Sequence, residues 1–180
     1  YLPETEVPEY LITTSPLPGD SYILNTNGLC LTIYTDNLKS ISKIGNIKST
    51  SSQLYVLANL YSQASGLDDS ILLNTRKNMI ETSRSNIYLV IDDILYTPPL
   101  NEGCLDGIMR RVLLQICNEQ NIPIQQEPLT LNLLESANEI FTTNAITGVQ
   151  WVKSVKEHLY SGNHWAQLLN KLLNEKAQVS

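Results

Sequence analysis

The pattern of apolar and polar positions predicts a series of short strands. Residues 28–35 are rich in Leu, Ile, Thr and Tyr, which is typical of a strand, and several compact apolar runs of strand length follow. The adjacent residues Asp92 and Asp93 separate two of these runs and favour a hairpin turn. Strands are expected at residues 10–14, 28–35, 70–74, 79–81, 86–91, 94–97, 138–144 and 148–155, with a further strand leading into a short helix within 122–131.

Three segments instead repeat their apolar residues with helical spacing. The first helix should begin near residues 50–52, where hydroxyl side chains can cap it, and stop at Gly66; the second should begin after Gly107. The first helix should bury one face, with Leu54, Leu57, Ala58, Tyr61 and Ala64. The second repeat is Ile108, Val112 and Ile116, with Leu113 and Cys117 alongside, and Trp165, Leu168, Leu169, Leu172 and Leu173 indicate an amphipathic third helix. The alternation of strands and helices around a hairpin predicts an α/β fold with a mixed, partly antiparallel sheet and flanking helices.

The bulk composition narrows the class of protein. A chain of 180 residues is long enough for one sizeable domain, and its formal net charge of −6 disfavours a nucleic-acid partner. No apolar run approaches the length of a membrane span, so we expect no membrane partner. The three cysteines form no close pair, which favours a reducing compartment, and we expect a cytoplasmic protein whose cysteines are small core residues. We interpret residues 1–12 as an inter-domain strand and linker, and 13–180 as the domain.

Several common catalytic motifs are absent from the sequence. It has no GxGxxG, P-loop, GxSxG or HExxH motif, so the usual signatures of dinucleotide, nucleotide, serine-hydrolase and zincin chemistry are missing. His158 and His164 have no Cys or carboxylate cluster around them, so we expect no metal site.

Four stretches carry the candidate chemistry. They are "GNIKSTSS" (45–52), "IETSRSNIYLV" (80–90), "LDGIMR" (105–110) and "FTTNAITGV" (141–149). Taken alone, Lys48 in the first is compatible with a surface lysine, and Glu81 in the second with either a loop residue or the partner of a buried cationic nitrogen. The third reads as a helix start, where free backbone N–H groups and the helix dipole favour a phosphate.

The order and spacing of these four stretches resemble those of the fold-type IV pyridoxal-phosphate enzymes, also called class IV aminotransferases. The resemblance runs from about residue 10 to the C-terminus and covers the large C-terminal domain of that family, with its D-amino-acid aminotransferase-like fold. The family includes branched-chain and D-amino-acid aminotransferases and 4-amino-4-deoxychorismate lyase. By the same resemblance, we expect the small N-terminal domain of the family to be missing from this chain.

The resemblance implies a role for each matching residue toward pyridoxal 5′-phosphate. Lys48 matches the catalytic lysine that links to the cofactor and moves a proton at the substrate's α-carbon. Glu81 matches the carboxylate below the ring nitrogen. The other matching positions are Ser85, Ile108, Met109 and Ala145 for cofactor binding and Asn144 for substrate binding. Arg110 is interpreted as structural.

The resemblance also suggests a reaction. The Asn-Ala turn and the "GIMR" step look closest to the 4-amino-4-deoxychorismate lyase branch, which releases pyruvate and forms 4-aminobenzoate for folate synthesis. The alternatives are a transaminase for branched-chain or other amino acids, and a catalytically degenerate homologue, because Ser51 and Ser52 replace the Asn and bulky residue common after the lysine. A homodimer acting on a small-molecule amino substrate is expected by the same resemblance.

Overall fold

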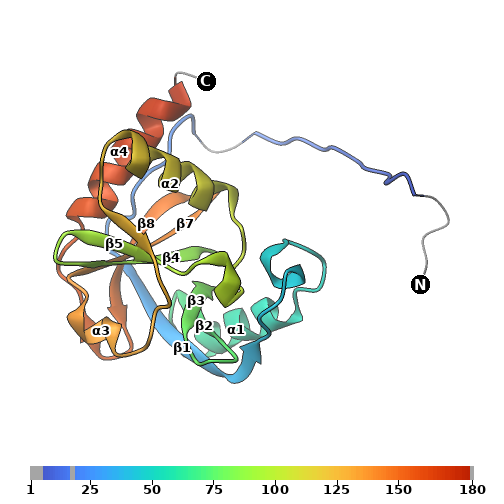
Figure 1. Ribbon diagram of the computed structural model, residues 1–180, viewed down its shortest axis with the longest axis horizontal. Helices are drawn as coiled ribbons and strands as arrows, with labels where there is room; N and C mark the ends of the chain where they lie inside the picture. Colours follow the sequence, from blue (N-terminus) through green and yellow to red (C-terminus); the bar gives the residue numbers. More distant parts are fainter. Residues whose placement is uncertain (1–5, 17–18, 179–180) are drawn as a thin grey trace.

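The computed structural model describes residues 6–16 and 19–178, and most of this length forms one sheet with helices packed around it (Figure 1). The strands are β1 (Leu29–Lys39), β2 (Asp69–Asn74), β3 (Met79–Thr82), β4 (Asn86–Ile91), β5 (Ile94–Thr97), β6 (Ile124–Gln126), β7 (Glu139–Asn144), β8 (Gly148–Val155) and β9 (His158–Leu159). The helices are α1 (Gln53–Ala64), α2 (Ile108–Glu119), α3 (Leu133–Ser136) and α4 (His164–Gln178), with short 3-10 turns η1 (Ile44–Asn46) and η2 (Leu100–Glu102). The predicted mixed α/β class with flanking helices is confirmed.

Six strands of the sheet close into a ring. The order β3-β2-β1-β8-β7-β4 is completed by a pairing of β3 with β4, and β5 and β6 extend the sheet beyond β4. β1 runs parallel to both of its neighbours, β2 and β8, whereas β3, β4, β7 and β8 pair in antiparallel fashion. Closure of a sheet leaves its strands without exposed edges, which removes a common route to aggregation.

Side chains that alternate along the strands pack into two different hydrophobic clusters. In β4, Ile87 and Leu89 belong to a cluster fed by all six ring strands, whereas Tyr88 and Val90 face a second cluster with helices α2 and α4. This is the period-2 alternation of a strand that is buried on both faces. A third, smaller cluster joins α1 to β1, β2 and β3. Helices α1, α2 and α4 therefore pack on the outside of the ring, and the first cluster consists mainly of strand side chains, joined by Leu129, Leu134 and Tyr160.

The predicted strand at residues 10–14 is wrong. Residues 8–16 have no regular secondary structure, Tyr10 and Leu11 are largely exposed, and the segment runs away from the folded body (Figure 1). A strand needs a partner for its backbone groups, and the described part of the chain offers this segment none. Tyr22 lies on the body, where its backbone N–H donates to Asn174 Oδ1 at 2.8 Å.

The predicted buried face of the first helix is only partly correct. Ala58 and Ser62 are fully buried, and Leu54 and Tyr55 pack against the third cluster. Leu57 and Tyr61, expected inside, are instead 47% and 38% exposed. The helix is turned so that Tyr55 points toward the sheet, which leaves an apolar strip of α1 uncovered.

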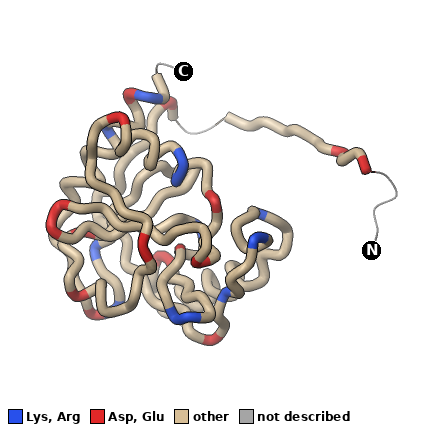
Figure 2. The backbone as a smooth tube through the Cα atoms, viewed as in Figure 1, with Lys and Arg blue, Asp and Glu red and all other residues tan. Residues whose placement is uncertain are grey.

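Charges and cysteines follow the expected distribution. Lys and Arg are scattered among Asp and Glu along the backbone without a continuous basic stripe in the described residues (Figure 2). Cys104 and Cys117 are buried and Cys30 is half-buried, all as free thiols. None of the helices within residues 6–16 and 19–178 has the length and apolar character to cross a membrane.

Candidate functional site

The candidate site forms where the ring of strands closes. Asn86, the first residue of β4, is opposite Glu81 on β3 and opposite Thr143 on β7. Its side-chain Nδ2 donates to the Leu105 carbonyl at 2.9 Å, in the loop that leads into α2. Asn86 therefore brings together three of the four stretches that the sequence singled out.

Glu81 is a buried carboxylate with three donors. Its Oε1 accepts from Lys39 Nζ at 2.6 Å and from the Tyr55 hydroxyl at 2.9 Å, and its Oε2 accepts from the Leu105 backbone N–H at 2.7 Å. A carboxylate has about four acceptor positions. The two donors on Oε1 fill that oxygen, so the remaining position lies on Oε2.

Lys39 is a residue of the candidate site that sequence reasoning missed. It ends β1 after a register shift against β2, and its side chain is 8% exposed in the ion pair with Glu81. Its Nζ also donates to the Gly45 carbonyl at 2.8 Å. A buried cationic partner was one of the two environments considered for Glu81, but no motif pointed to this lysine.

Tyr55 adds a neutral donor to the same carboxylate. Its ring lies 5.3 Å from Lys39 Nζ, in cation–π geometry. Burial, together with the Glu81 charge and the hydrogen bond to it, raises the pKa of Tyr55 far above its ordinary value. The hydroxyl therefore keeps its proton and acts only as a donor toward Glu81.

The start of α2 presents unpaired backbone donors. The backbone N–H groups of Ile108, Met109 and Arg110 form no hydrogen bond with any residue in the described part of the chain, and Gly107 at the N-cap offers no side chain. Such N–H groups, with the helix dipole behind them, form an anion site. Ile108 is exposed and Met109 is buried, so these positions contribute through their backbone.

Gly107 is required by close packing at this helix start. A Cβ on Gly107 would lie 2.2 Å from Asn86 Oδ1, although the backbone angles of Gly107 would suit any residue. Arg110 lies in the first turn of α2 and is 2% exposed. It donates to the Pro98 carbonyl at 2.9 Å and to Gln126 at 2.7 Å. The interpretation of Arg110 as structural is thus supported by its contacts.

Ser85 and Asn144, two of the predicted site residues, are in contact through their side chains. Asn144 Nδ2 donates to Ser85 Oγ at 2.9 Å, and Asn144 Oδ1 accepts from the backbone N–H groups of Ile146 and Thr147. These bonds make the tight turn between β7 and β8, on which Ala145 is exposed. Because Thr143 pairs with Asn86, this turn lies next to the same end of β4 as Glu81.

Lys48 lies in the exposed loop between η1 and α1, and no described contact joins it to Glu81. The loop is nevertheless fastened near the site through Asn46, whose Nδ2 donates to the Cys104 carbonyl at 2.6 Å and whose carbonyl accepts from the Asp106 N–H at 2.9 Å. Two residues of chain span at most about 7 Å. Lys48 is therefore held within a short distance of the loop that precedes α2.

These groups fit the chemical needs of pyridoxal 5′-phosphate. The Oε2 atom of Glu81 can accept from a protonated ring nitrogen, and the free N–H groups at the start of α2 suit a phosphate dianion. An amine for the aldehyde is available on the Lys48 loop. Each of the three polar parts of the cofactor thus has a matching group in this part of the fold.

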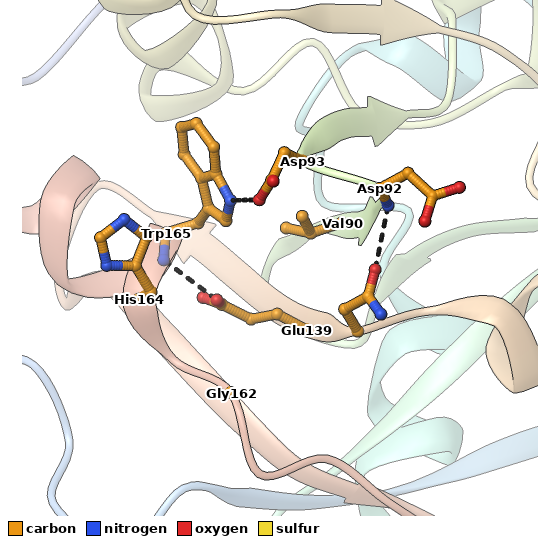
Figure 3. Close-up of a pocket in the computed structure, with 8 residues that line it drawn as sticks. Val90, Asp92, Asp93, Glu139, Gly162, His164 and Trp165 are labelled. Carbon is orange, nitrogen blue, oxygen red and sulfur yellow. Dashed lines mark hydrogen bonds between the residues drawn. The ribbon is translucent and has the colours of Figure 1, made fainter.

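One pocket in the described residues lies away from this site (Figure 3). It has a volume of about 390 Å³ and gathers around Glu139, at the opposite end of β7 from Asn144, which places it roughly 17 Å away along the strand. Figure 3 shows Glu139 bound to the backbone N–H of Trp165 and the Trp165 indole bound to Asp93. The Glu139 carboxylate caps α4 and belongs to the folding of that helix.

Known proteins resemble the chain in sequence. Residues 1–155 match the family model described as amino-transferase class IV. A protein of Methanocaldococcus jannaschii, provisionally named a branched-chain-amino-acid aminotransferase, is 29% identical over 126 residues, which is 70% of this chain and 44% of that protein. The chain therefore spans less than half the length of this relative.

Solved structures resemble the chain in fold. The branched-chain aminotransferase of Thermoproteus uzoniensis superimposes with a TM-score of 0.83 at 22% identity, over 91% of this chain and 55% of that one. A Legionella pneumophila protein provisionally named 4-amino-4-deoxychorismate lyase gives a TM-score of 0.77 at 27% identity, over 88% and 59%. The family model covers most of the chain, and the fold agrees with it. The chain belongs to the class IV aminotransferase family.

Proposed function

We propose that this chain is the cofactor-binding part of a pyridoxal 5′-phosphate enzyme that acts on a small-molecule amine. Class IV aminotransferases use this cofactor. The observation that carries the proposal is the convergence, around Asn86, of a buried carboxylate with one open acceptor position and a helix start with free N–H groups.

The residues of the chain would divide the work as follows. Bound pyridoxal phosphate supplies an aldehyde that links to amines and a ring that takes up the electron pair released at the substrate's α-carbon. Glu81 Oε2 would accept a hydrogen bond from the protonated ring nitrogen, and the N–H groups of Ile108 and Met109 would hold the phosphate. Lys48 would supply the amine for the aldehyde and would move the proton at the substrate's α-carbon.

The turn between β7 and β8 completes the proposed site. Ser85 and Ala145 would contribute to cofactor binding, and Asn144 would face the substrate. Asn144 is held by three hydrogen bonds within its own turn and by Ser85, so it would meet the substrate as a rigid group. Rigid polar groups position a substrate at a lower entropic cost.

The first experiment is an absorbance spectrum of the protein at its full natural length with pyridoxal phosphate. An absorption band near the edge of the visible range is expected in the parent protein and should be lost in Lys48→Ala. The control is Lys171→Ala, which changes an exposed lysine of α4 and should keep the band. Borohydride reduction followed by peptide mass spectrometry should locate the cofactor on Lys48. A band that survives in Lys48→Ala, or a cofactor found on Lys39, would refute the assignment of the catalytic lysine.

For the reaction, we propose 4-amino-4-deoxychorismate lyase chemistry, with pyruvate release and formation of 4-aminobenzoate for folate synthesis. The Asn144–Ala145 turn and the 27% identical Legionella structure support it. A branched-chain transaminase is the second candidate, supported by the Methanocaldococcus relative. Pyruvate release from aminodeoxychorismate without any keto acid would support the lyase, whereas amino transfer that requires a keto acid would support the transaminase. If neither activity is found and no Lys48-dependent absorption band appears, the protein is a degenerate homologue.

We further propose a cytoplasmic homodimer. Three free cysteines suit a reducing compartment. The uncovered strip of α1 carries Val56, Leu57 and Leu60, each about half exposed, and such a strip is typical of an interface. Light scattering should show a dimer in the parent and a monomer after the double change Leu57→Glu and Leu60→Glu; a dimer that persists in that variant would place the interface elsewhere.

A further inference from the structure

Lys39 is an unusual place for a lysine. Charged amines are almost never buried unless they are paired, because removing the charge from water is costly. Lys39 is 7% exposed, and its Nζ is compensated by the Glu81 carboxylate at 2.6 Å and the Gly45 carbonyl at 2.8 Å. The amine thus links the β3 carboxylate to the η1 turn.

We propose that Lys39 is a positioning residue for the cofactor: it holds the Glu81 carboxylate so that Oε2 faces the ring nitrogen, and it fixes the η1 turn that precedes Lys48. The inference rests on the proposed function. It assigns a role to a residue outside the four sequence stretches, and it explains why a buried lysine lies at this point of the fold.

The arrangement on Glu81 determines which oxygen is available. Lys39 and Tyr55 together occupy the two acceptor positions of Oε1, so a ring nitrogen can only approach Oε2, beside the Leu105 N–H. The titratable groups around the carboxylate are Lys39, Tyr55 and the Cys104 thiol, and only Lys39 carries a positive charge. Without Lys39, Oε1 would keep only the Tyr55 donor, so each oxygen would have an open acceptor position and a ring nitrogen could approach either one.

A ring nitrogen that can bind either oxygen is positioned less firmly than one that is directed to Oε2 alone. Loss of Lys39 would also free the Gly45 carbonyl, three residues before Lys48, and loosen the loop at one of its attachments. Asn46 would still hold the loop to the Cys104 carbonyl. Loss of Lys39 should therefore weaken cofactor binding and alter its titration without detaching the loop.

The test compares Lys39→Met with Lys39→Arg and with the exposed-site control Lys171→Met, in the full-length protein. Two quantities are measured: the dissociation constant of pyridoxal phosphate, and the midpoint of the pH titration of the bound cofactor's absorption band. In Lys39→Met, affinity should fall by about tenfold to a hundredfold, as expected when a hydrogen bond between charged groups is lost. The midpoint should shift, Lys39→Arg should recover part of both effects, and Lys171→Met should match the parent.

A double change tests whether the effect acts through the carboxylate. Once Glu81→Gln has removed the charge, adding Lys39→Met should change the midpoint little, whereas independent effects would add. Thermal melting without cofactor reports the folding of each variant. If Lys39→Met does not fold, the Tyr55→Phe variant takes its place in the test. This variant removes the other donor to Oε1, so it should shift the midpoint of the cofactor titration in the same direction.

The outcomes separate this inference from the proposed function. A parent with a Lys48-dependent band, beside a Lys39→Met variant with unchanged affinity and midpoint, would overturn the role of Lys39 and leave the function standing. An unchanged midpoint in Tyr55→Phe, where Lys39→Met fails to fold, would do the same. A parent without any Lys48-dependent band would overturn both.

Discussion

The contact between Gly107 and Asn86 yields a prediction whose magnitude can be worked out. In Gly107→Ala the new methyl group would lie 2.2 Å from Asn86 Oδ1, far inside contact distance. Asn86 is 5% exposed, and its amide is held by the 2.9 Å bond to the Leu105 carbonyl, so it cannot turn away without breaking that bond. The substitution must therefore overpack the site or break a buried hydrogen bond.

Overpacking costs about 1–3 kcal/mol and a lost hydrogen bond about 1 kcal/mol, while alanine recovers about 0.4–1 kcal/mol by restricting the unfolded chain. The free energy of unfolding should fall by about 2 kcal/mol, which lowers the melting temperature by roughly 4–8 °C in a chain of this size. The free energy of unfolding can be measured by urea denaturation, with the fluorescence of Trp151 and Trp165 as the signal. The matched control is Gly19→Ala, where a Cβ would meet nothing within 4 Å and the change should stay within about 0.5 kcal/mol.

A double-mutant cycle shows whether the clash is with Asn86. In the Asn86→Ala background the offending oxygen is gone, so Gly107→Ala should cost at least about 1 kcal/mol less than in the parent. Equal costs in the two backgrounds, or a Gly107→Ala variant as stable as Gly19→Ala, would refute the reasoning.

Three further predictions concern stability and reactivity. Arg110→Met should lower the free energy of unfolding by about 2–4 kcal/mol in urea denaturation, because it removes the guanidinium donor and leaves the buried Pro98 carbonyl only the weak Cys104 thiol donor; an undiminished value would contradict the structural role. Burial raises the pKa of Glu139, so its stabilising contribution is full below the ordinary glutamate range and is lost as pH rises through the raised value. The stability of Glu139→Gln relative to the parent should consequently increase with pH across that window, and parallel curves would exclude this residue as the cause. Burial raises the pKa of Cys104 to about 11, so iodoacetamide at pH 8 should label Cys30 in the native protein and Cys104 only after unfolding, as peptide mass spectrometry would show.

Much of the fold could be predicted from the chain because its local signals are strong. The hairpin between β4 and β5 was placed correctly, since Asp92 and Asp93 both adopt the positive φ values that a tight hairpin turn requires. The ring of strands could not be predicted. Its closure depends on one opposing pair, Glu81 and Asn86, and on the parallel contacts of β1, neither of which leaves a periodic trace in the sequence.

The candidate site was predicted by motif rather than by contact. The four stretches led to Glu81, Ser85 and Asn144, because each lies beside turn residues in a recognisable order. Lys39 and Tyr55 were missed for a different reason. Lys39 sits at the end of a strand where a surface lysine would be unremarkable, and only a register shift buries it; Tyr55 reaches Glu81 only because α1 is rotated.

The parallel position of β1 has a consequence for synthesis of the protein on the ribosome. Leu29 pairs with Val152, about 120 residues later in the chain, and β8 is the neighbour on that side. Contacts so distant in sequence cannot form until the later strand has left the ribosome, and they carry a large loop-closure cost. During translation, the edge of β1 that later pairs with β8 must therefore stay unpaired until β8 has been synthesised.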